Sequence, residues 1–141
     1  MVLMEEKKIK GRKRHICVDT CGNLLSIKVH AANIPDTSAG PDVLYRAFKN
    51  YSSIRAAAAN LGYRGTTACF AEQYLRIRMD FSSKHIVNAR LVPIKKRWIV
   101  ERFFAWIGNF RRLAKDYEYL SKTSEQIIIC SAIFLLLQRL A

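Results

Sequence analysis

The feature that most constrains the fold is the stretch of residues 94–118, which reads IKKRWIVERFFAWIGNFRRLAKDYE. Read as one helix from residue 98 onward, it separates into two faces of different character. One face carries an apolar stripe at helical spacing: Ile99, Phe103, Trp106, Phe110, Leu113 and Tyr117. The other face carries Arg97, Glu101, Ala105, Gly108, Arg112 and Lys115. The carboxylate of Glu101 is therefore expected among cations, beside small residues that leave room for a bulky ligand.

Two interpretations of Glu101 follow from this spacing. Arg97 lies four residues before it, and such a pair commonly decorates a solvated helix face. A carboxylate among four cations also suits a phosphate backbone that carries a bound metal ion. Spacing alone favours the ordinary ion pair.

A longer match shifts this balance. The segment RWIVERFFAWIGNFRRLAKDYE resembles the third catalytic motif of bacterial insertion-sequence transposases of group five, which belong to the DDE superfamily and have an RNase H-like fold. The resemblance implies that Arg97 and Glu101 are the Arg and the catalytic, metal-binding Glu of that motif. It also implies a set of residues that hold DNA phosphates around the motif: Lys95, Lys96, Arg111, Arg112 and Lys115.

Charge independently indicates a polyanionic partner. The 141 residues include 24 Lys and Arg against 11 acids, a net charge of +13, which is far more than solubility requires. Nucleic acid is the first candidate and an anionic membrane surface the second. The four cysteines lack the spacing of a zinc site. The apolar run of residues 127–137 is too short for a bilayer, which needs roughly 20 residues, so we expect no membrane anchor.

The first fifteen residues contain a dense basic run. Two compatible interpretations are a frayed, solvated terminus and phosphate contacts through Lys10, Arg12, Lys13 and Arg14. Residues 15–19 and 24–31 then predict a β-hairpin, because apolar and polar residues alternate in the second segment. In the transposase family these segments form the second and third strands of the sheet. We interpret Asp19 as a turn residue and Asp36 as a helix N-cap.

The remaining elements alternate between helix and strand. Helices are predicted over residues 36–51 and 66–75, and strands over residues 53–59 and 76–82. The box formed by Thr123 and Gln126 predicts the start of a final helix that reaches about residue 140. That helix is apolar on nearly every side, so it is expected to be buried against the sheet or a partner.

The turn after the predicted strand of residues 53–59 holds a second family motif. The sequence Ala-Asn-Leu-Gly-Tyr-Arg-Gly matches the family's Ala-Asp-x-Gly-Tyr-Arg-Gly, whose Asp is the second metal-binding carboxylate. Asn60 occupies that position here, and Arg64 is a further expected DNA contact. Because a neutral amide is a weaker ligand for Mg²⁺ than a carboxylate, the change implies loss of most of the activity.

The resemblance places the family's first catalytic Asp on a strand that precedes the basic run. The expected fold class is therefore α/β: an incomplete RNase H-like fold whose mixed sheet lacks its first strand and is flanked by helices, with a hydrophobic C-terminal helix. Residues 1–141 are expected to form a single partial catalytic domain without the N-terminal DNA-binding region. Two of the three catalytic acids would then be missing. Exposed sheet edges predict marginal stability or self-association.

The leading hypothesis is a truncated insertion-sequence transposase that has lost DNA cleavage and strand transfer. The intact family uses Mg²⁺ or Mn²⁺, and its DNA partners are the element ends and the target. The resemblance implies a bacterial cytoplasmic protein at the nucleoid. Two alternatives remain: a non-catalytic DNA-binding regulator that competes with intact transposase, and a product completed by frameshifting. General RNA binding is disfavoured, because the sequence contains no evident aromatic-rich platform.

Overall fold

The computed structural model describes residues 2–9, 11–81, 86–87, 90–91 and 97–141. Its main sheet has five strands in the order β3-β2-β1-β4-β5, and a separate pair of short strands, β6 and β7, forms a two-stranded sheet. The strands are β1 (Val2–Ile9), β2 (Arg12–Val18), β3 (Leu24–Ala31), β4 (Ala56–Ala59), β5 (Arg78–Phe81), β6 (Ile86–Val87) and β7 (Arg90–Leu91).

Strand β1 occupies the middle of the main sheet. It pairs antiparallel with β2, where Leu3 lies opposite Val18, and parallel with β4, where Leu3 lies opposite Ala58. Two predictions are therefore wrong for residues 2–9: that they form a frayed terminus, and that the sheet lacks a strand at its centre. The physical reason is pairing on both sides, because β2 and β4 would otherwise each leave a row of backbone groups unpaired.

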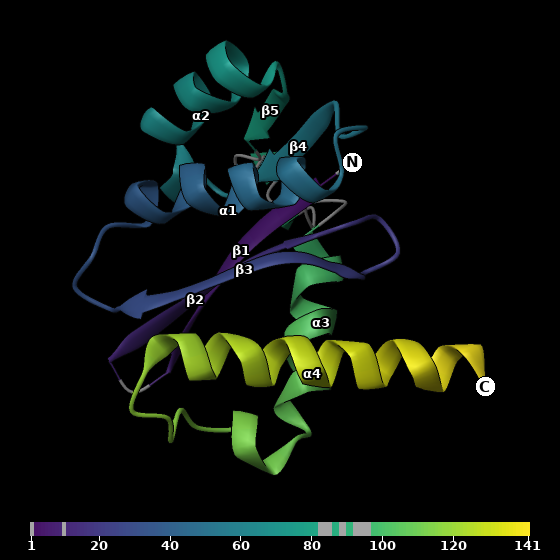
Figure 1. The fold of residues 1–141 in the computed structure, drawn as a ribbon. Helices are drawn as coiled ribbons and strands as arrows, with labels where there is room; N and C mark the ends of the chain where they lie inside the picture. The colour runs from purple at the N-terminus through teal and green to yellow at the C-terminus, as the bar shows by residue number, and fades with distance from the viewer. Residues whose placement is uncertain (1, 10, 82–85, 88–89, 92–96) are drawn as a thin grey trace.

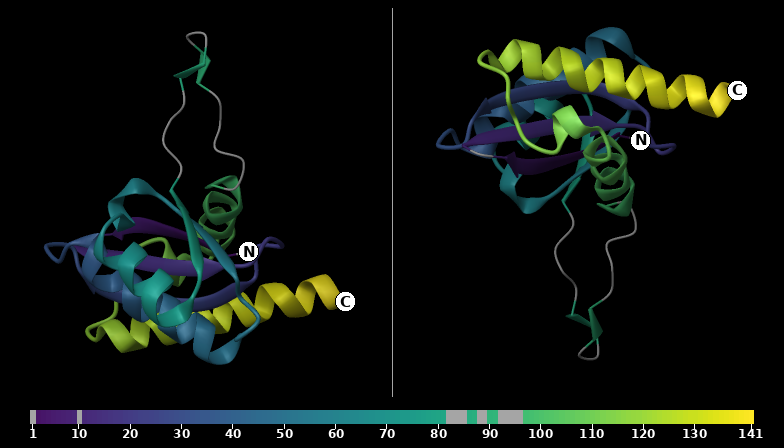
Figure 2. Two further views of the ribbon diagram at one scale, coloured as in Figure 1. Left: turned by 90° about the horizontal axis from the view of Figure 1, so that it is seen from above. Right: turned by 90° about the horizontal axis from the view of Figure 1, so that it is seen from below.

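Helices cover both faces of the sheet. α1 and α2 lie on one face, and α3 and α4 lie on the other (Figures 1 and 2). The helices are α1 (Asp36–Asn50), α2 (Thr66–Phe70), α3 (Arg97–Gly108) and α4 (Ser121–Leu140), with short helical turns η1 (Leu61–Tyr63), η2 (Ala71–Leu75, a π-helical turn) and η3 (Arg111–Leu113). The mixed α/β architecture and the apolar C-terminal helix agree with the predicted fold class.

The core forms two apolar layers, one on each face of the sheet. Cys17 of β2 packs into the layer beneath α1, whereas its neighbours Ile16 and Val18 pack into the layer beneath α3 and α4. The same alternation assigns Ala57 and Ala58 of β4 to opposite layers. Successive side chains along a strand point to opposite faces. The basic residues of β2 therefore also alternate between the two faces of the sheet.

The predicted hairpin is confirmed, with β2 beginning earlier than expected. Asp19 makes the turn, because its Oδ1 accepts hydrogen bonds from the backbone N–H groups of Cys21 and Asn23 at 2.8 and 2.9 Å. Gly22 has a φ of +85°, and a Cβ there would lie 3.3 Å from the guanidinium of Arg102. Glycine is favoured at such a position for both reasons.

Three predicted helix boundaries need correction. The helix that carries Glu101 ends at Gly108, and Phe110 is extended with a ψ of 118°. Glycine followed by Asn109 is a poor helix interior, so the apolar spacing that continues to Tyr117 does not extend the helix. α4 begins at Ser121, before the predicted capping box. α1 is capped by Pro35, and Asp36 is its first residue.

α4 is longer than the apolar run that the sequence indicates. By length and composition it is one helix that could cross a membrane, with a mean hydropathy of 1.3 in a window that is 22% buried. In this fold it packs against β3, where the Glu125 carboxylate accepts the backbone N–H of Val29 at 2.8 Å. The helix is therefore part of the domain, with one side against the sheet and an apolar side exposed.

Candidate functional site

Glu101 lies on the second turn of α3 and is exposed. The helix is anchored on its other side, where Ile99, Phe103 and Ile107 are buried in the layer against the sheet. The predicted inner stripe is thus confirmed at its first two positions. Ala105, one turn after Glu101, is also exposed, so the helix presents a carboxylate with a small neighbour to the outside.

Stacked contacts between tryptophan rings and guanidinium groups, here called the ladder, hold α3 against α4 and the β2–β3 turn. The Arg102 guanidinium lies 4.5 Å from the ring centroid of Trp98 and 4.7 Å from that of Trp106. Arg139 of α4 lies 4.5 Å from the same Trp106 ring, and its Nη1 donates to Asn23 at 3.0 Å. Cation–π contacts of this kind each contribute about 0.5–2 kcal/mol. The ladder ties α3, the end of α4 and the β2–β3 turn together, which holds the backbone of Glu101 in place.

Asn60 directly follows β4, where the sequence motif predicts it. A Cβ on Gly62 would lie 3.0 Å from Asp36 Oδ2 and 3.3 Å from Asn60 Oδ1, so both side chains lie close over this glycine. The amide oxygen of Asn60 is buried. The position expected for a metal ligand therefore lies beside the Asp36 carboxylate at the start of α1.

A buried polar cluster surrounds this turn on the α1 side of the sheet. Lys13 Nζ lies 2.6 Å from Asp36 Oδ1 and donates to the carbonyl of Ile34 at 3.0 Å. His15 Nδ1 and the Tyr63 hydroxyl share a hydrogen bond of 2.5 Å. Burial is the largest cause that lowers the pKa of His15 to about 4, so the ring is neutral at physiological pH. The cluster holds the motif turn to β2.

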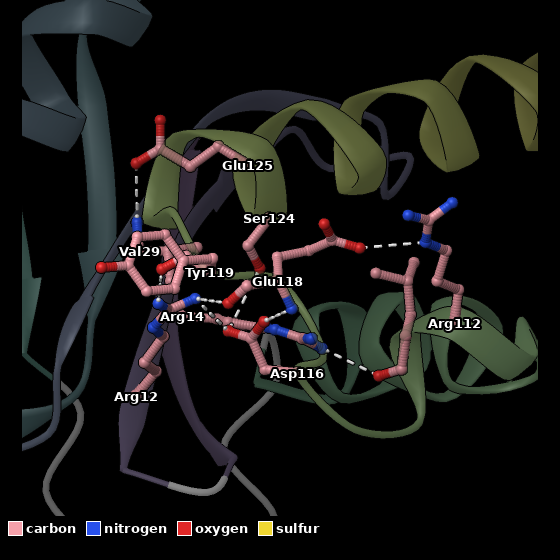
Figure 3. A network of polar contacts seen from close by, with 10 residues as sticks. Arg12, Arg14, Val29, Arg112, Asp116, Glu118, Tyr119, Ser124 and Glu125 are labelled. Atoms are coloured by element: carbon pink, nitrogen blue, oxygen red, sulfur yellow. Dashed lines mark hydrogen bonds and ion pairs between the residues drawn. The ribbon is translucent and has the colours of Figure 1, made fainter.

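On the other side of the sheet, two arginines of β2 bind the segment that joins α3 to α4 (Figure 3). Arg12 Nη1 lies 3.1 Å from Asp116 Oδ2, and its Nη2 donates to the carbonyl of Tyr119 at 2.6 Å. Arg14 is 1% exposed, and its Nη1 donates to the carbonyl of Leu113 at 3.1 Å. Burial lowers the pKa of Arg14, against an opposing effect of Asp116. These guanidinium groups therefore stabilise the fold by holding the α3–α4 segment to β2.

The predicted DNA contacts therefore separate into two groups. Arg12, Lys13 and Arg14 bind partners within the chain, and the buried Arg14 presents no surface to a phosphate. A second group is exposed: Arg64, Arg111, Arg112 and Lys115. Of these, Arg112 pairs with Glu118 at 2.9 Å. Because α3 ends early, Arg111, Arg112 and Lys115 do not share a helix face with Glu101. Lys10, Lys95 and Lys96 lie outside the described residues, as does the side chain of Arg97, the first residue of α3.

Sequence reasoning missed the structural use of β2 and of the tyrosine in the second motif. The signal was available, because the residues Arg12, Lys13, Arg14 and His15 lie in a strand, where alternation directs them to opposite faces. What the sequence did not contain was the partner of each side chain. Asp116 lies 104 residues from Arg12, and Tyr63 lies 48 residues from His15.

A two-metal centre requires several charged oxygen ligands gathered in one place. In the described part of the chain, no group of three or more His, Cys, Asp or Glu side chains is placed to hold a metal ion. Glu101 offers one carboxylate, and Asn60 contributes a neutral amide whose oxygen is buried. A hard divalent cation needs several charged oxygens. The described residues therefore do not fit a two-metal centre.

Comparison with known proteins gives a family and a fold. The family described as Transposase DDE domain matches residues 5–137. Among solved structures, the catalytic core domain of BIV integrase is similar with a TM-score of 0.57 and 10% sequence identity, over 94% of this chain and 80% of that one. At this identity the likeness concerns the fold alone, and it supports an RNase H-like architecture. A comparison with curated protein sequences gives no match.

Proposed function

Because this chain belongs to the DDE-domain transposase family, we propose that it binds DNA through its exposed cations without cutting it. The observation that carries this proposal is Asn60. The motif around it keeps the form Gly62-Tyr63-Arg64-Gly65 that follows the family's second carboxylate, yet the side chain is an amide. The fold of a DNA-processing enzyme is thus kept while a group needed for its chemistry is replaced.

The family generally uses divalent metal ions, whose role is to activate the attacking oxygen and neutralise charge on the phosphate. Glu101 is the residue of this chain most suited to bind such an ion, since it is an exposed carboxylate on a well-anchored helix. Asn60 is poorly suited to bind such an ion, because its neutral amide supplies no charge to balance a cation. A single carboxylate ligand at this helix favours weak, exchangeable metal binding.

DNA binding itself needs only cations that are accessible. Arg64, Arg111 and Lys115 are exposed, and the net charge of +13 favours a polyanion at long range. Lysine and arginine that contact phosphates release counterions, so the affinity should fall steeply as salt rises. This electrostatic binding would be independent of base sequence unless base edges are also contacted.

The test combines binding with cleavage. We would measure the affinity of a labelled random-sequence duplex over a range of salt, and nicking of supercoiled plasmid in Mg²⁺ and Mn²⁺. We expect salt-dependent binding and no nicking. Asn60→Asp restores the family's carboxylate at this position, and its matched control, Asn60→Asp with Glu101→Gln, removes the carboxylate of the other motif. Metal-dependent nicking by the unsubstituted chain that Glu101→Gln abolishes would overturn the proposal of an inactive protein.

A second candidate function is that of a non-catalytic competitor of an intact transposase. The exposed apolar side of α4 favours it, because Ile133, Phe134, Leu137 and Leu140 are exposed on one helix. Large exposed apolar patches commonly mark protein interaction sites. Such a competitor should prefer the element's end sequence over random DNA, and it should lower cleavage when mixed with the intact enzyme. Equal affinity for both sequences and no inhibition would exclude this second candidate.

A further inference from the structure

The segment of residues 109–120 that joins α3 to α4, which we call the strap, sorts its side chains by charge. Both of its acids turn inward. The Asp116 carboxylate is 3% exposed and lies between Arg12, at 3.1 Å, and the Ser124 hydroxyl, at 3.3 Å. Glu118 is mostly buried against Arg112, at 2.9 Å. The negative charge of the strap is therefore compensated within the protein.

The backbone of the strap is held from beneath by the two arginines of β2 (Figure 3). Arg12 donates to the carbonyls of Glu118 and Tyr119 at 2.9 and 2.6 Å, and Arg14 donates to that of Leu113 at 3.1 Å. The Leu113 side chain is buried in the core. Hydrogen bonds to a charged group are stronger than those between neutral groups, so the outward side of the strap has a defined shape.

That outward side carries cations and aromatic rings. Tyr117 is 64% exposed and Tyr119 is 93% exposed. Arg111 and Lys115 precede them and are exposed, and Lys122 follows in the first turn of α4. The three residues Lys115, Tyr117 and Tyr119 alternate with the inward acids. The half-buried Arg12 and the buried Arg14 thus hold a segment that presents tyrosine rings to water beside positive charge.

We propose that the strap binds a single DNA strand with unpaired bases, which stack on Tyr117 and Tyr119 while Arg111 and Lys115 contact the phosphates. The inference rests on the proposed function, since it assumes that the chain binds DNA. Positive charge favours the polyanion, and aromatic rings accept any base because every base has a π-face. Gly108 follows Glu101 by seven residues, a rise of about 10 Å along the helix axis, so a strand on the strap would begin at about that distance from Glu101.

The first experiment measures the affinity of a labelled oligothymidylate of about 15 nucleotides, in the range that single-strand sites cover, and of a duplex of equal length. The full chain is compared with Tyr117→Ala/Tyr119→Ala. Stacking contributes about 1–3 kcal/mol per base, so single-strand affinity should fall roughly tenfold or more. Duplex affinity should change less than about twofold, because no charge is altered.

Matched controls separate stacking from other effects. Tyr45→Ala/Tyr74→Ala removes two exposed rings, one on α1 and one on η2, and it should leave single-strand affinity unchanged. Tyr117→Phe/Tyr119→Phe keeps the rings and should retain the affinity of the unsubstituted chain. In the unsubstituted protein, an oligonucleotide that contains iododeoxyuridine should crosslink under light to Tyr117 or Tyr119, identified by mass spectrometry.

The outcomes distinguish single-strand binding by the strap from DNA binding by the chain as a whole. A chain that binds duplex, but whose single-strand affinity is unchanged by Tyr117→Ala/Tyr119→Ala, overturns the strap inference alone. A chain that binds neither form of DNA overturns both. Because a tyrosine and lysine segment before an apolar helix also suits a lipid interface, phosphatidylserine vesicles are included. Tyrosine-dependent vesicle binding with unaltered single-strand affinity would assign the strap to membranes and overturn the proposal.

Discussion

The cations of β2 and the cations of the strap have similar sequence contexts and opposite environments. Arg12, Lys13 and Arg14 are three consecutive basic residues, yet each side chain binds an acceptor within the protein. Arg111 and Lys115 also lie next to other basic or acidic residues, but they are exposed. Positive charge in the sequence therefore does not identify a phosphate contact until the neighbouring carboxylates and carbonyls are located.

The difference follows from backbone conformation. In a strand in the middle of a sheet, alternation sends side chains into both helical layers, where a cation must find an acceptor or lose stability. The strap crosses the outside of the domain and has one side in water. Asp116 of the strap takes an inward position and pairs with Arg12, whereas the Arg14 guanidinium donates to the carbonyl of Leu113. The arginines of β2 thus hold the strap in place, and the strap exposes Arg111 and Lys115 to solvent.

The largest expected effect is on folding stability, from removing Arg12. Arg12→Ala leaves the Asp116 carboxylate buried without its main partner, and it removes the donors to Glu118 and Tyr119. We expect the free energy of unfolding in urea to fall by about 3 kcal/mol. Lys115→Ala, a control in the strap, should change it by less than about 0.5 kcal/mol. If Arg12→Ala instead weakened DNA binding and left the free energy of unfolding unchanged, Arg12 would act as a DNA contact and not as a stabilising residue.

A second basic side chain of β2 to test is His15, through the pH dependence of stability. Its pKa is about 4 in the folded protein and about 6.5 when unfolded. The unfolded state therefore binds more protons between these values, and the free energy of unfolding should fall as pH decreases from about 6.5 to about 4. The loss should reach about 2–3 kcal/mol.

The measurement is urea unfolding at several pH values in this window, for the unsubstituted chain and for His15→Gln. Carboxylates also titrate there, so the comparison isolates the histidine. Gln stays neutral and can still contact the Tyr63 hydroxyl, so the variant should show a smaller pH dependence. Lys13, Asp36, Lys28 and His30 also act on the His15 pKa and remain in both proteins. Parallel curves would mean that His15 is not buried in its neutral form.

The exposed cations should show the reverse pattern, with an effect on binding and none on stability. Arg111→Ala/Lys115→Ala removes two expected phosphate contacts. The slope of log affinity against log salt for duplex DNA should decrease by about 2, while the free energy of unfolding stays within about 0.5 kcal/mol. Lys49→Ala/Arg55→Ala removes two exposed cations from the opposite part of the fold. Equal slopes for both double variants would show that the strap has no special role.

Much of the fold could be predicted from the sequence. The alternation in residues 24–31 predicted β3, the apolar spacing predicted α1, and the motif turn correctly placed Asn60 after a short buried strand. These features are local, since periodicity or a short motif contains the necessary information. The position of Glu101 on an exposed helix face was predictable for the same reason, because Ile99 and Phe103 define the opposite side.

The rest depended on partners distant in sequence. β1 (Val2–Ile9) reads as an apolar start followed by charges, and its identity as a central strand comes from pairing with β2 and β4. The end of α3 at Gly108 was indicated locally, but the apolar spacing continued past it and favoured a longer helix. The inward acids of the strap could not be predicted, because nothing within the strap indicates that Arg12 lies beneath Asp116.

The smallest expected effect concerns the pair of Arg112 and Glu118, which lies on the border between the two sets. Arg112 is 69% exposed although it contacts Glu118 at 2.9 Å. Exposed ion pairs contribute about 0.2–1 kcal/mol, so Arg112→Ala should lower the free energy of unfolding by about 0.5 kcal/mol. Because the pair already compensates its charge, the salt slope of duplex binding should change by less than for Lys115→Ala. A full unit of change in that slope would place Arg112 with the phosphate contacts and show that Glu118 releases it when DNA binds.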